Sequence, residues 1–258
     1  MEQKQKLILV IGSTGGVGQL VVAKLITKNY QVRILTRNQQ KAEQLFGKQL
    51  EIYEGTISDS EIIQKASKSV SNIICTIGST AFPSSKWQLN FTNFGESLKA
   101  YLKPKQLAKK AKNSPLQVDA EGVTNIIDNC DRTQLEKFIL VSSCGVLRTN
   151  QFPYTILNLF GVLNAKKKGE DYLINSGIPY TIIRPSRLID GPFTSYDLNT
   201  LLKTQMKDRQ TEIVIGTGDK INGQSSRIDV ANVCVQSLQD DTYINKAFEI
   251  ITVPKKQA

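Results

Sequence analysis

Three glycines near the amino terminus are spaced to bring a backbone turn against a phosphate group. Gly12, Gly15 and Gly18 form a GxxGxxG pattern within Gly12-Ser13-Thr14-Gly15-Gly16-Val17-Gly18. In such a turn the first glycine permits a tight bend, the second admits a pyrophosphate, and the third lets a helix pack close to a strand. The N–H groups that begin the helix then favour the phosphates. The pattern predicts a dinucleotide ligand, with Ser13 and Thr14 as additional hydroxyl donors.

A second residue, Arg37, could select between the two nicotinamide dinucleotides. The chain reads Thr36-Arg37-Asn38 where the second predicted strand ends, and no carboxylate follows until Glu43. An acid at this position accepts hydrogen bonds from the ribose hydroxyls of NAD, whereas an arginine pairs with a 2′-phosphate and stacks on adenine. The sequence therefore favours NADP(H) over NAD(H). The alternative is an arginine that faces solvent and makes no specific contact.

The elements that would position these residues alternate between strands and helices. Nearly continuous apolar runs predict buried parallel strands at residues 6–11, 31–36, 50–54, 72–75, 137–141, 180–184 and 248–252. Helical spacing predicts helices at 17–28, from Asp59 as an N-cap, and at 118–130, 164–175 and 229–238. This alternation is typical of an α/β fold with a doubly wound parallel Rossmann sheet flanked by helices. We expect one domain over residues 1–258.

Two long stretches interrupt this alternation, at residues 80–116 and 186–223. Both follow the carboxyl ends of predicted strands, the fourth and the sixth, where open α/β sheets bind their ligands. We therefore expect substrate-side insertions there. The first holds Phe82, Trp87, Phe91 and Phe94. Packing of the insertion itself is the first interpretation of these aromatic residues, and a stacking platform for a planar acceptor is the second.

Composition excludes several classes of chemistry. The chain has no histidine, which excludes histidine triads, histidine general bases and histidine metal sites. Its four cysteines include no CxxC pair and predict buried thiols in a reducing compartment, with a reactive thiol at Cys144 as a lesser alternative. There is no run of about 18 apolar residues and no signal or transit segment at the polar amino terminus, so we expect a cytoplasmic protein without a transmembrane segment.

The net charge of +10 is partly local. A lysine-rich insert at about 88–113 is opposed only by Glu96, and its lysines are Lys99, Lys103, Lys105, Lys109, Lys110 and Lys112. A solvated segment is the first interpretation, and a docking surface for a protein partner is the alternative. No RNA-binding aromatic signature accompanies the lysines, so we expect no nucleic-acid partner. Nothing in the sequence indicates the oligomeric state.

Several further motifs resemble the atypical short-chain dehydrogenase/reductase family over nearly the whole chain. Beside the glycine turn and the Thr36-Arg37-Asn38 end, they lie at residues 55–59, 118–123, 138–143, 166–173, 176–185 and 226–231. The segments at 81–87 and 188–192 resemble a branch found in cyanobacteria and plastids, so a plastid stroma is the alternative location if the protein is plastid-encoded.

The resemblance implies roles for individual residues. Ser143 and Lys166 match the family's catalytic serine and lysine, and the lysine would also hold the cofactor's ribose. Thr56 and Ile57 would lie near adenine, Thr76 and Gly78 by the nicotinamide ribose, and Pro185 and Ser186 at the nicotinamide amide.

One position departs from the family. Its catalytic tyrosine, which donates a proton to a carbonyl oxygen, lies four residues before the lysine, and this chain has Val162 there. Two hypotheses follow. In the first, the protein is a reductase that transfers hydride to a small planar acceptor, such as a flavin, quinone or bilin, which needs little acid catalysis. In the second, it is a non-catalytic NADPH-dependent redox sensor or assembly factor that binds a protein partner through the lysine-rich insert.

Overall fold

The computed structural model of the chain describes residues 6–84, 87, 107–108, 111–190, 197–206 and 211–255. Within these ranges one sheet has the strand order β3-β2-β1-β4-β5-β6-β10-β8. The strands are β1 (Leu7–Ile11), β2 (Gln31–Thr36), β3 (Glu51–Glu54), β4 (Asn72–Cys75), β5 (Lys137–Val141), β6 (Tyr180–Pro185), β8 (Thr211–Gly216) and β10 (Lys246–Pro254). All neighbouring pairs are parallel except β8 with β10. The doubly wound α/β fold is therefore confirmed, with an antiparallel edge strand that the prediction of a parallel sheet did not include.

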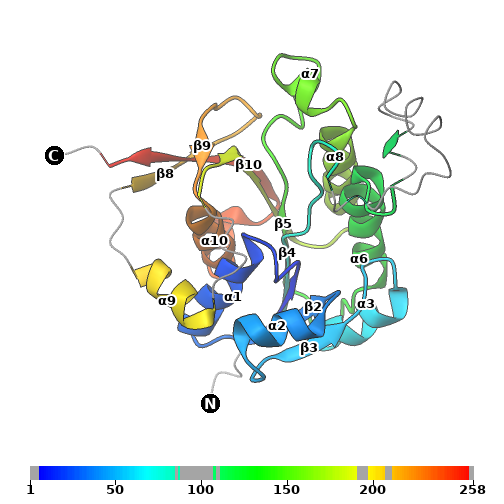
Figure 1. Ribbon diagram of the computed structural model, residues 1–258, viewed down its shortest axis with the longest axis vertical. Helices are drawn as coiled ribbons and strands as arrows, with labels where there is room; N and C mark the ends of the chain where they lie inside the picture. Colours follow the sequence, from blue (N-terminus) through cyan, green and yellow to red (C-terminus); the bar gives the residue numbers. More distant parts are fainter. Residues whose placement is uncertain are drawn as a thin grey trace.

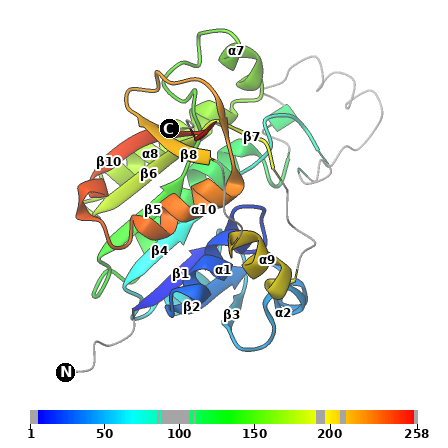
Figure 2. The ribbon, with the colours of Figure 1, turned by 90° about the vertical axis from the view of Figure 1, so that its left-hand side faces the viewer.

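Helices cover both faces of the sheet (Figures 1 and 2). On one face lie α1 (Gly18–Thr27), α9 (Leu198–Met206) and α10 (Arg227–Gln236), with α2 (Gln39–Phe46) packed beside α1. On the other face lie α3 (Ser60–Ser67), α6 (Val123–Asn129) and α8 (Val162–Ile174). Asp59 caps α3 as expected, because its carboxylate accepts hydrogen bonds from the backbone N–H groups of Glu61 and Ile62.

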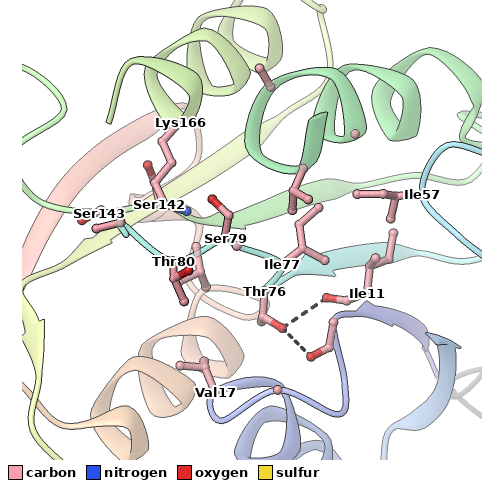
Figure 3. Close-up of a pocket in the computed structure, with 18 of the residues that line it drawn as sticks. Ile11, Val17, Ile57, Thr76, Ile77, Ser79, Thr80, Ser142, Ser143 and Lys166 are labelled. Atoms are coloured by element: carbon pink, nitrogen blue, oxygen red, sulfur yellow. Dashed lines mark hydrogen bonds between the residues drawn. The ribbon is translucent and has the colours of Figure 1, made fainter. Parts of the chain in front are cut away.

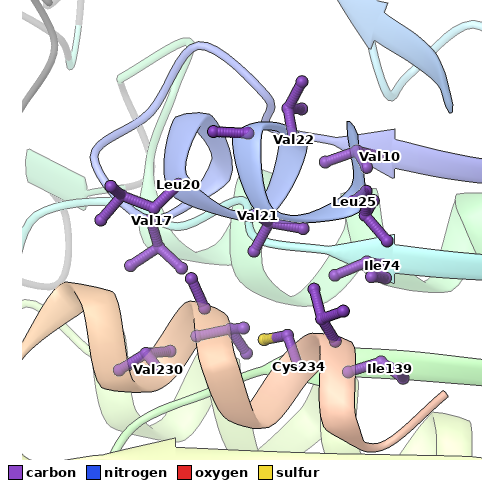
Figure 4. Close-up of a cluster of buried hydrophobic side chains, with 14 of the residues drawn as sticks. Val10, Val17, Leu20, Val21, Val22, Leu25, Ile74, Ile139, Val230 and Cys234 are labelled. Atoms are coloured by element: carbon purple, nitrogen blue, oxygen red, sulfur yellow. The ribbon is translucent and has the colours of Figure 1, made fainter. Parts of the chain in front are cut away.

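Two apolar clusters fill the spaces between the sheet and its helices. In the cluster shown in Figure 4, Val21 of α1 and Val230 and Cys234 of α10 pack together over strand residues that include Val10, Ile74 and Ile139. The second cluster lies on the opposite face, under α3, α6 and α8. Because successive residues of β1, such as Leu9 and Val10, enter different clusters, the strand is apolar throughout rather than alternating.

The helix expected at 118–130 begins differently from the prediction. Residues Leu116–Gly122 form a π-helical turn, η2, which continues into α6. Such turns are rare and occur often at functional sites.

Several short elements lie outside the main sheet and its covering helices. The short helix α7 (Tyr154–Leu157) projects beyond the sheet (Figures 1 and 2), and β7 (Arg187–Leu188) pairs with β9 (Gln224–Ser225). A 3-10 turn, η3 (Asp241–Tyr243), precedes β10.

Part of the first predicted insertion lies within the described residues. Trp87 is fully buried against Ala108, Ala111 and Phe160, which agrees with packing of the insertion as the role of this tryptophan. Most of the lysine-rich insert, together with Phe91 and Phe94, lies outside the described residues. In the part of the chain that the structure describes, no helix combines the length and the apolar character needed to cross a membrane.

Candidate functional site

The glycine turn joins β1 to α1 and is braced by a neighbouring strand end. Gly12 has φ +86°, and a Cβ atom there would lie 2.9 Å from the backbone nitrogen of Ile77. The hydroxyl of Thr76, just after β4, donates to the carbonyls of Ile11 at 3.1 Å and Gly12 at 3.2 Å (Figure 3). These contacts fix the conformation of the turn and require glycine at its first position.

The other two glycines of the motif, Gly15 and Gly18, lie close to the carbonyl oxygen of Gly12. The backbone N–H of Gly15 donates to the carbonyl oxygen of Gly12 at 3.0 Å. A Cβ atom on Gly18 would lie 2.2 Å from that oxygen, whereas one on Gly15 would lie 3.2 Å from it. Gly18 is therefore needed for close packing of α1 on the turn, and Gly15 leaves the turn's outer side open to a ligand.

One cavity of about 2530 Å³ runs along the carboxyl ends of the parallel strands. Small-molecule sites usually measure about 300–1,000 Å³, so there is room here for a dinucleotide and a second molecule. The cavity brings together most of the residues expected at the site: Gly12, Thr14, Gly15, Gly16, Val17, Arg37, Thr56, Ile57, Thr76, Gly78, Ser143, Lys166, Pro185 and Ser186. Ser13 and Gly18 are not among its lining residues, because both are buried behind the turn.

Positive charge gathers at the end of the cavity beside β2. Arg37, Lys41 and Lys112 all line it there and are exposed, and the Arg37 guanidinium donates to the side-chain oxygen of Asn113 at 3.4 Å. Lys41 comes from α2 and Lys112 from the end of the lysine-rich insert. This end of the cavity can therefore attract a phosphate group.

A buried ion pair holds Lys166 at the other end. Its ammonium nitrogen lies 2.6 Å from Oδ1 of Asp119 in η2. The second oxygen of Asp119 accepts the backbone N–H of Ser79 at 3.1 Å and also the Ser79 hydroxyl. Figure 3 shows Lys166 and Ser79 approaching the cavity from α8 and the β4 end. The lysine is thus fixed, with part of its hydrogen-bonding capacity left for a ligand in the cavity.

The sequence analysis did not assign a role to Asp119 or Ser79. Asp119 lies 47 residues before Lys166 and meets it only because α8 packs closely on η2. Gly169 makes that approach possible, since a Cβ atom there would lie 2.5 Å from the Asp119 carbonyl oxygen. The sequence signal for Asp119 was its place in the segment at 118–123, which resembles the family.

Two serines follow β5 beside Lys166. The Ser143 hydroxyl lines the cavity and donates to the carbonyl of Cys144 at 3.0 Å. The Ser142 hydroxyl is buried and has no hydrogen-bond partner among the described residues, although Ser142 also lines the cavity. A hydroxyl left in this state can donate to a bound ligand.

Val162 is buried at the start of α8, in an apolar cluster with Val146 and Leu163. It does not line the cavity. No phenol therefore reaches the cavity from this position.

The tyrosine closest in sequence, Tyr154, lines the cavity, but its hydroxyl is held in a polar cluster. Its hydroxyl accepts from Arg148 at 2.8 Å and donates to the side-chain oxygen of Asn222 at 3.2 Å. Arg148 in turn contacts the buried Asp219 at 3.2 Å, and the arginine lies over the tyrosine ring. Burial raises the pKa of Tyr154. The phenol therefore stays protonated and serves to join α7 to the loop before β9.

The reactive thiol considered at Cys144 is not supported. Its Sγ is buried and donates to the carbonyl of Arg184 at 3.1 Å. Burial raises its pKa to about 11, so the reactive thiolate is scarce at neutral pH.

Comparison with known proteins relates the chain to nicotinamide-dependent proteins. Residues 12–241 match the family described as NAD(P)H-binding. Protein TIC 62, chloroplastic, from Pisum sativum is 30% identical over 95% of this chain and 42% of its own length. Sanguinarine reductase from Eschscholzia californica is 30% identical over 98% of this chain and 91% of its own. Photosystem II assembly factor Ycf39 from Trieres chinensis is 27% identical over 93% and 62%. The chain spans less than half the length of the TIC 62 proteins that it matches.

Solved structures agree on the fold. A putative NAD-dependent epimerase/dehydratase from Bacillus halodurans superposes with a TM-score of 0.69 at 19% identity, over 97% of this chain and 95% of the other. A wide-type short-chain dehydrogenase/reductase from Veillonella parvula in complex with NADP gives 0.64 at 15% identity, over 96% and 95%. At these identities the likeness shows a shared Rossmann-like fold.

Proposed function

The chain belongs to the NAD(P)H-binding family of atypical short-chain dehydrogenase/reductase-like Rossmann proteins, and from this we propose that it is an NADPH-dependent reductase of a planar acceptor. The observation that carries the proposal is one cavity that joins the glycine turn to Lys166 and Ser143 and is large enough for a second molecule. The relative named sanguinarine reductase, similar over almost its whole length, adds support.

The residues present fit the cofactor. The glycine turn leaves a cradle that side chains would fill, and it lies beside the start of α1, where backbone N–H groups favour phosphate. Thr56 and Ile57 would flank the adenine, Thr76 and Gly78 the nicotinamide ribose, and Pro185 and Ser186 the amide. When bound, the reduced nicotinamide supplies a hydride.

The chain's own residues would position the cofactor more than they would move protons. Lys166, fixed by Asp119, would donate to the ribose hydroxyls, and Ser143 would orient the acceptor. With an apolar residue at position 162, the site offers no phenol there to protonate a developing alkoxide. An acceptor whose conjugated rings spread the incoming charge needs no such acid, and this favours flavins, quinones or bilins over simple carbonyls.

Arg37→Ala tests the proposed preference for NADP(H). In this proposal Arg37 contacts the 2′-phosphate, and Lys41 and Lys112, which also line the cavity, add positive charge. The substitution should weaken NADPH binding about 10-fold, as expected for the loss of one charge-assisted hydrogen bond, and leave NADH binding unchanged. Titration calorimetry with both cofactors measures the difference. Equal affinities for NADPH and NADH in the unsubstituted protein would contradict the role given to Arg37.

Turnover tests the reductase itself. NADPH consumption, followed by the absorbance of the reduced nicotinamide, should rise on adding at least one member of a panel of flavins, quinones and bilins. Gly15→Asp serves as the control, because a carboxylate in the turn repels the pyrophosphate. Tight NADPH binding without turnover on any acceptor would overturn the proposal.

That last outcome would favour a second function, an NADPH-dependent sensor or assembly factor. Two observations support it: the apolar surroundings of Val162, and the relatives named TIC 62 and Photosystem II assembly factor Ycf39. The lysine-rich insert at 88–113 would then bind the protein partner. Shortening the insert within residues 88–105, which leaves Lys112 and Asn113 in place at the cavity, should abolish that partner's binding and preserve NADPH binding.

A further inference from the structure

Arg187 is an arginine without a counter-charge in the acceptor half of the cavity. It lies in β7, two residues after Pro185, and its exposed side chain lines the cavity. Among the described residues its side chain has no hydrogen bond or ion pair, whereas its backbone belongs to the β7–β9 pairing. Since Pro185 and Ser186 are the proposed nicotinamide contacts, Arg187 stands beside the place where an acceptor must stack to receive a hydride.

Three other arginines in this part of the fold each have an acidic partner, and Arg187 differs from them in this respect. Arg148 contacts Asp219 at 3.2 Å, and Arg227 lies 3.7 Å from a carboxylate oxygen of Asp190. Arg184, deeper in the sheet, lies 2.7 Å from Glu170. The fold thus supplies an acid for each of these three guanidinium groups, whereas none of the described residues supplies one for Arg187.

The same part of the cavity has an apolar wall. Phe152 and Leu157, in and before α7, line the same cavity as Arg187, and the hydroxyl of Tyr154 between them bonds to Arg148 and Asn222. Phe152 lines the cavity and is 80% exposed, so most of its ring surface is free of contacts within the protein. An exposed aromatic side chain at such a place is suited to cover the face of a flat ligand.

We propose that Arg187 binds an anionic side group, a carboxylate or a phosphate, carried by the planar acceptor. This inference rests on the proposed function and narrows its substrate class. A guanidinium presents paired N–H donors that match both groups, and its charge is weakly hydrated and therefore inexpensive to desolvate. The apolar side chains would pack against the acceptor's rings, and Arg187 would bind its anionic side group.

The test compares acceptors that differ only in the anionic group. Binding to the NADP⁺-loaded protein is measured by titration calorimetry for FMN against riboflavin, and for a bilin with free propionates against its dimethyl ester. The unsubstituted protein should bind at least one anionic member about 10- to 100-fold more tightly than its neutral partner. Arg187→Ala should remove this preference, and Arg187→Lys should restore part of it.

Lys246→Ala is the matched control, because it removes one exposed positive charge at the opposite, amino-terminal edge of β10. It should keep the preference. A preference for FMN alone would identify a phosphate as the group bound, and one for the free bilin alone a carboxylate.

Three results would overturn the inference: equal binding of both members of each pair, a preference that survives Arg187→Ala, or no binding of any acceptor. This test measures binding and not turnover. If the protein prefers the anionic acceptors through Arg187 but turns none of them over, the proposed reductase activity is refuted and the inference about Arg187 stands.

Discussion

Gly18→Ala should abolish dinucleotide binding and destabilise the fold together. A Cβ atom at this position would lie 2.2 Å from the carbonyl oxygen of Gly12 and 2.8 Å from the Cα atom of Ser13. Both contacts are with backbone, so no side chain can rotate away, and α1 must move from the turn. We expect a loss of about 1–3 kcal/mol in the free energy of unfolding, as for overpacked cores. Displacement of the helix start should weaken NADPH binding by about 100-fold or more.

Gly15→Ala separates the two effects. Its Cβ atom would lie 3.2 Å from the same carbonyl oxygen, a tight contact that a small shift relieves. Gly15 lines the cavity, however, so the methyl group would occupy space proposed for the pyrophosphate. This variant should therefore keep its unfolding free energy and lose NADPH affinity. Denaturant unfolding and calorimetric titration of both variants measure the two quantities. Full cofactor affinity in Gly18→Ala would contradict the proposed site.

The sequence predicted those features that depend on one kind of residue in one local structure, such as apolar residues in a buried strand or glycines in a tight turn. The apolar runs within Leu7–Ile11 and Lys137–Val141 identified strands because both faces of the sheet are covered. The glycine turn and the strand ends could be placed at one edge because parallel strands end together. Those two features account for most of the residues that line the cavity.

Elements without a strong apolar pattern were missed. Helix α2 buries only Ala42, Leu45 and Phe46, and its start depends on Asn38 accepting a hydrogen bond from the backbone of Lys41. Strand β8 lies within a stretch predicted to be an insertion. Its residues alternate between half-buried and exposed over much of its length, because it is the edge strand.

Contacts between distant segments could not be predicted from the sequence either. The Asp119–Lys166 pair needs a π-helical turn, a glycine on the facing helix and a strand end that carries Ser79. The Arg148–Asp219 pair joins residues 71 positions apart. Neither pair leaves a periodic signal, since each is set by tertiary packing and not by local propensity.

A buried charge cluster below the nicotinamide end gives the largest expected effect on stability. Arg184, near the end of β6, donates to both oxygens of Glu170, at 3.1 Å and 2.7 Å. Glu249 of β10 lies 3.7 Å from the same guanidinium, and both glutamates are fully buried. Glu170 lies one helical turn after Lys166 on α8. The cluster therefore ties the helix that carries the lysine to the strand that ends at Pro185.

Glu170→Gln should lower the free energy of unfolding by about 3–5 kcal/mol, the usual result when one partner of a buried pair is neutralised. The amide retains the size of the side chain, so the loss reports charge and not a cavity. Burial lowers the pKa of Arg184, but the hydrogen bond and charge of Glu170 more than offset this and raise it. The variant loses the Glu170 charge, but an arginine keeps its proton in proteins, so the guanidinium stays charged and its nearest remaining acid is the more distant Glu249.

Asp171→Asn on the same helix is the matched control. Asp171 pairs with Lys167 in a partly exposed contact one turn apart, and such helix pairs contribute about 0.3–0.5 kcal/mol. Denaturant unfolding should show little change in this variant and a large one in Glu170→Gln. Equal losses of unfolding free energy in the two variants would mean that burial does not determine how much each ion pair contributes to stability. A stable Glu170→Gln protein with weakened NADPH binding would instead assign the cluster to positioning Lys166 and Pro185, with no major part in holding the fold together.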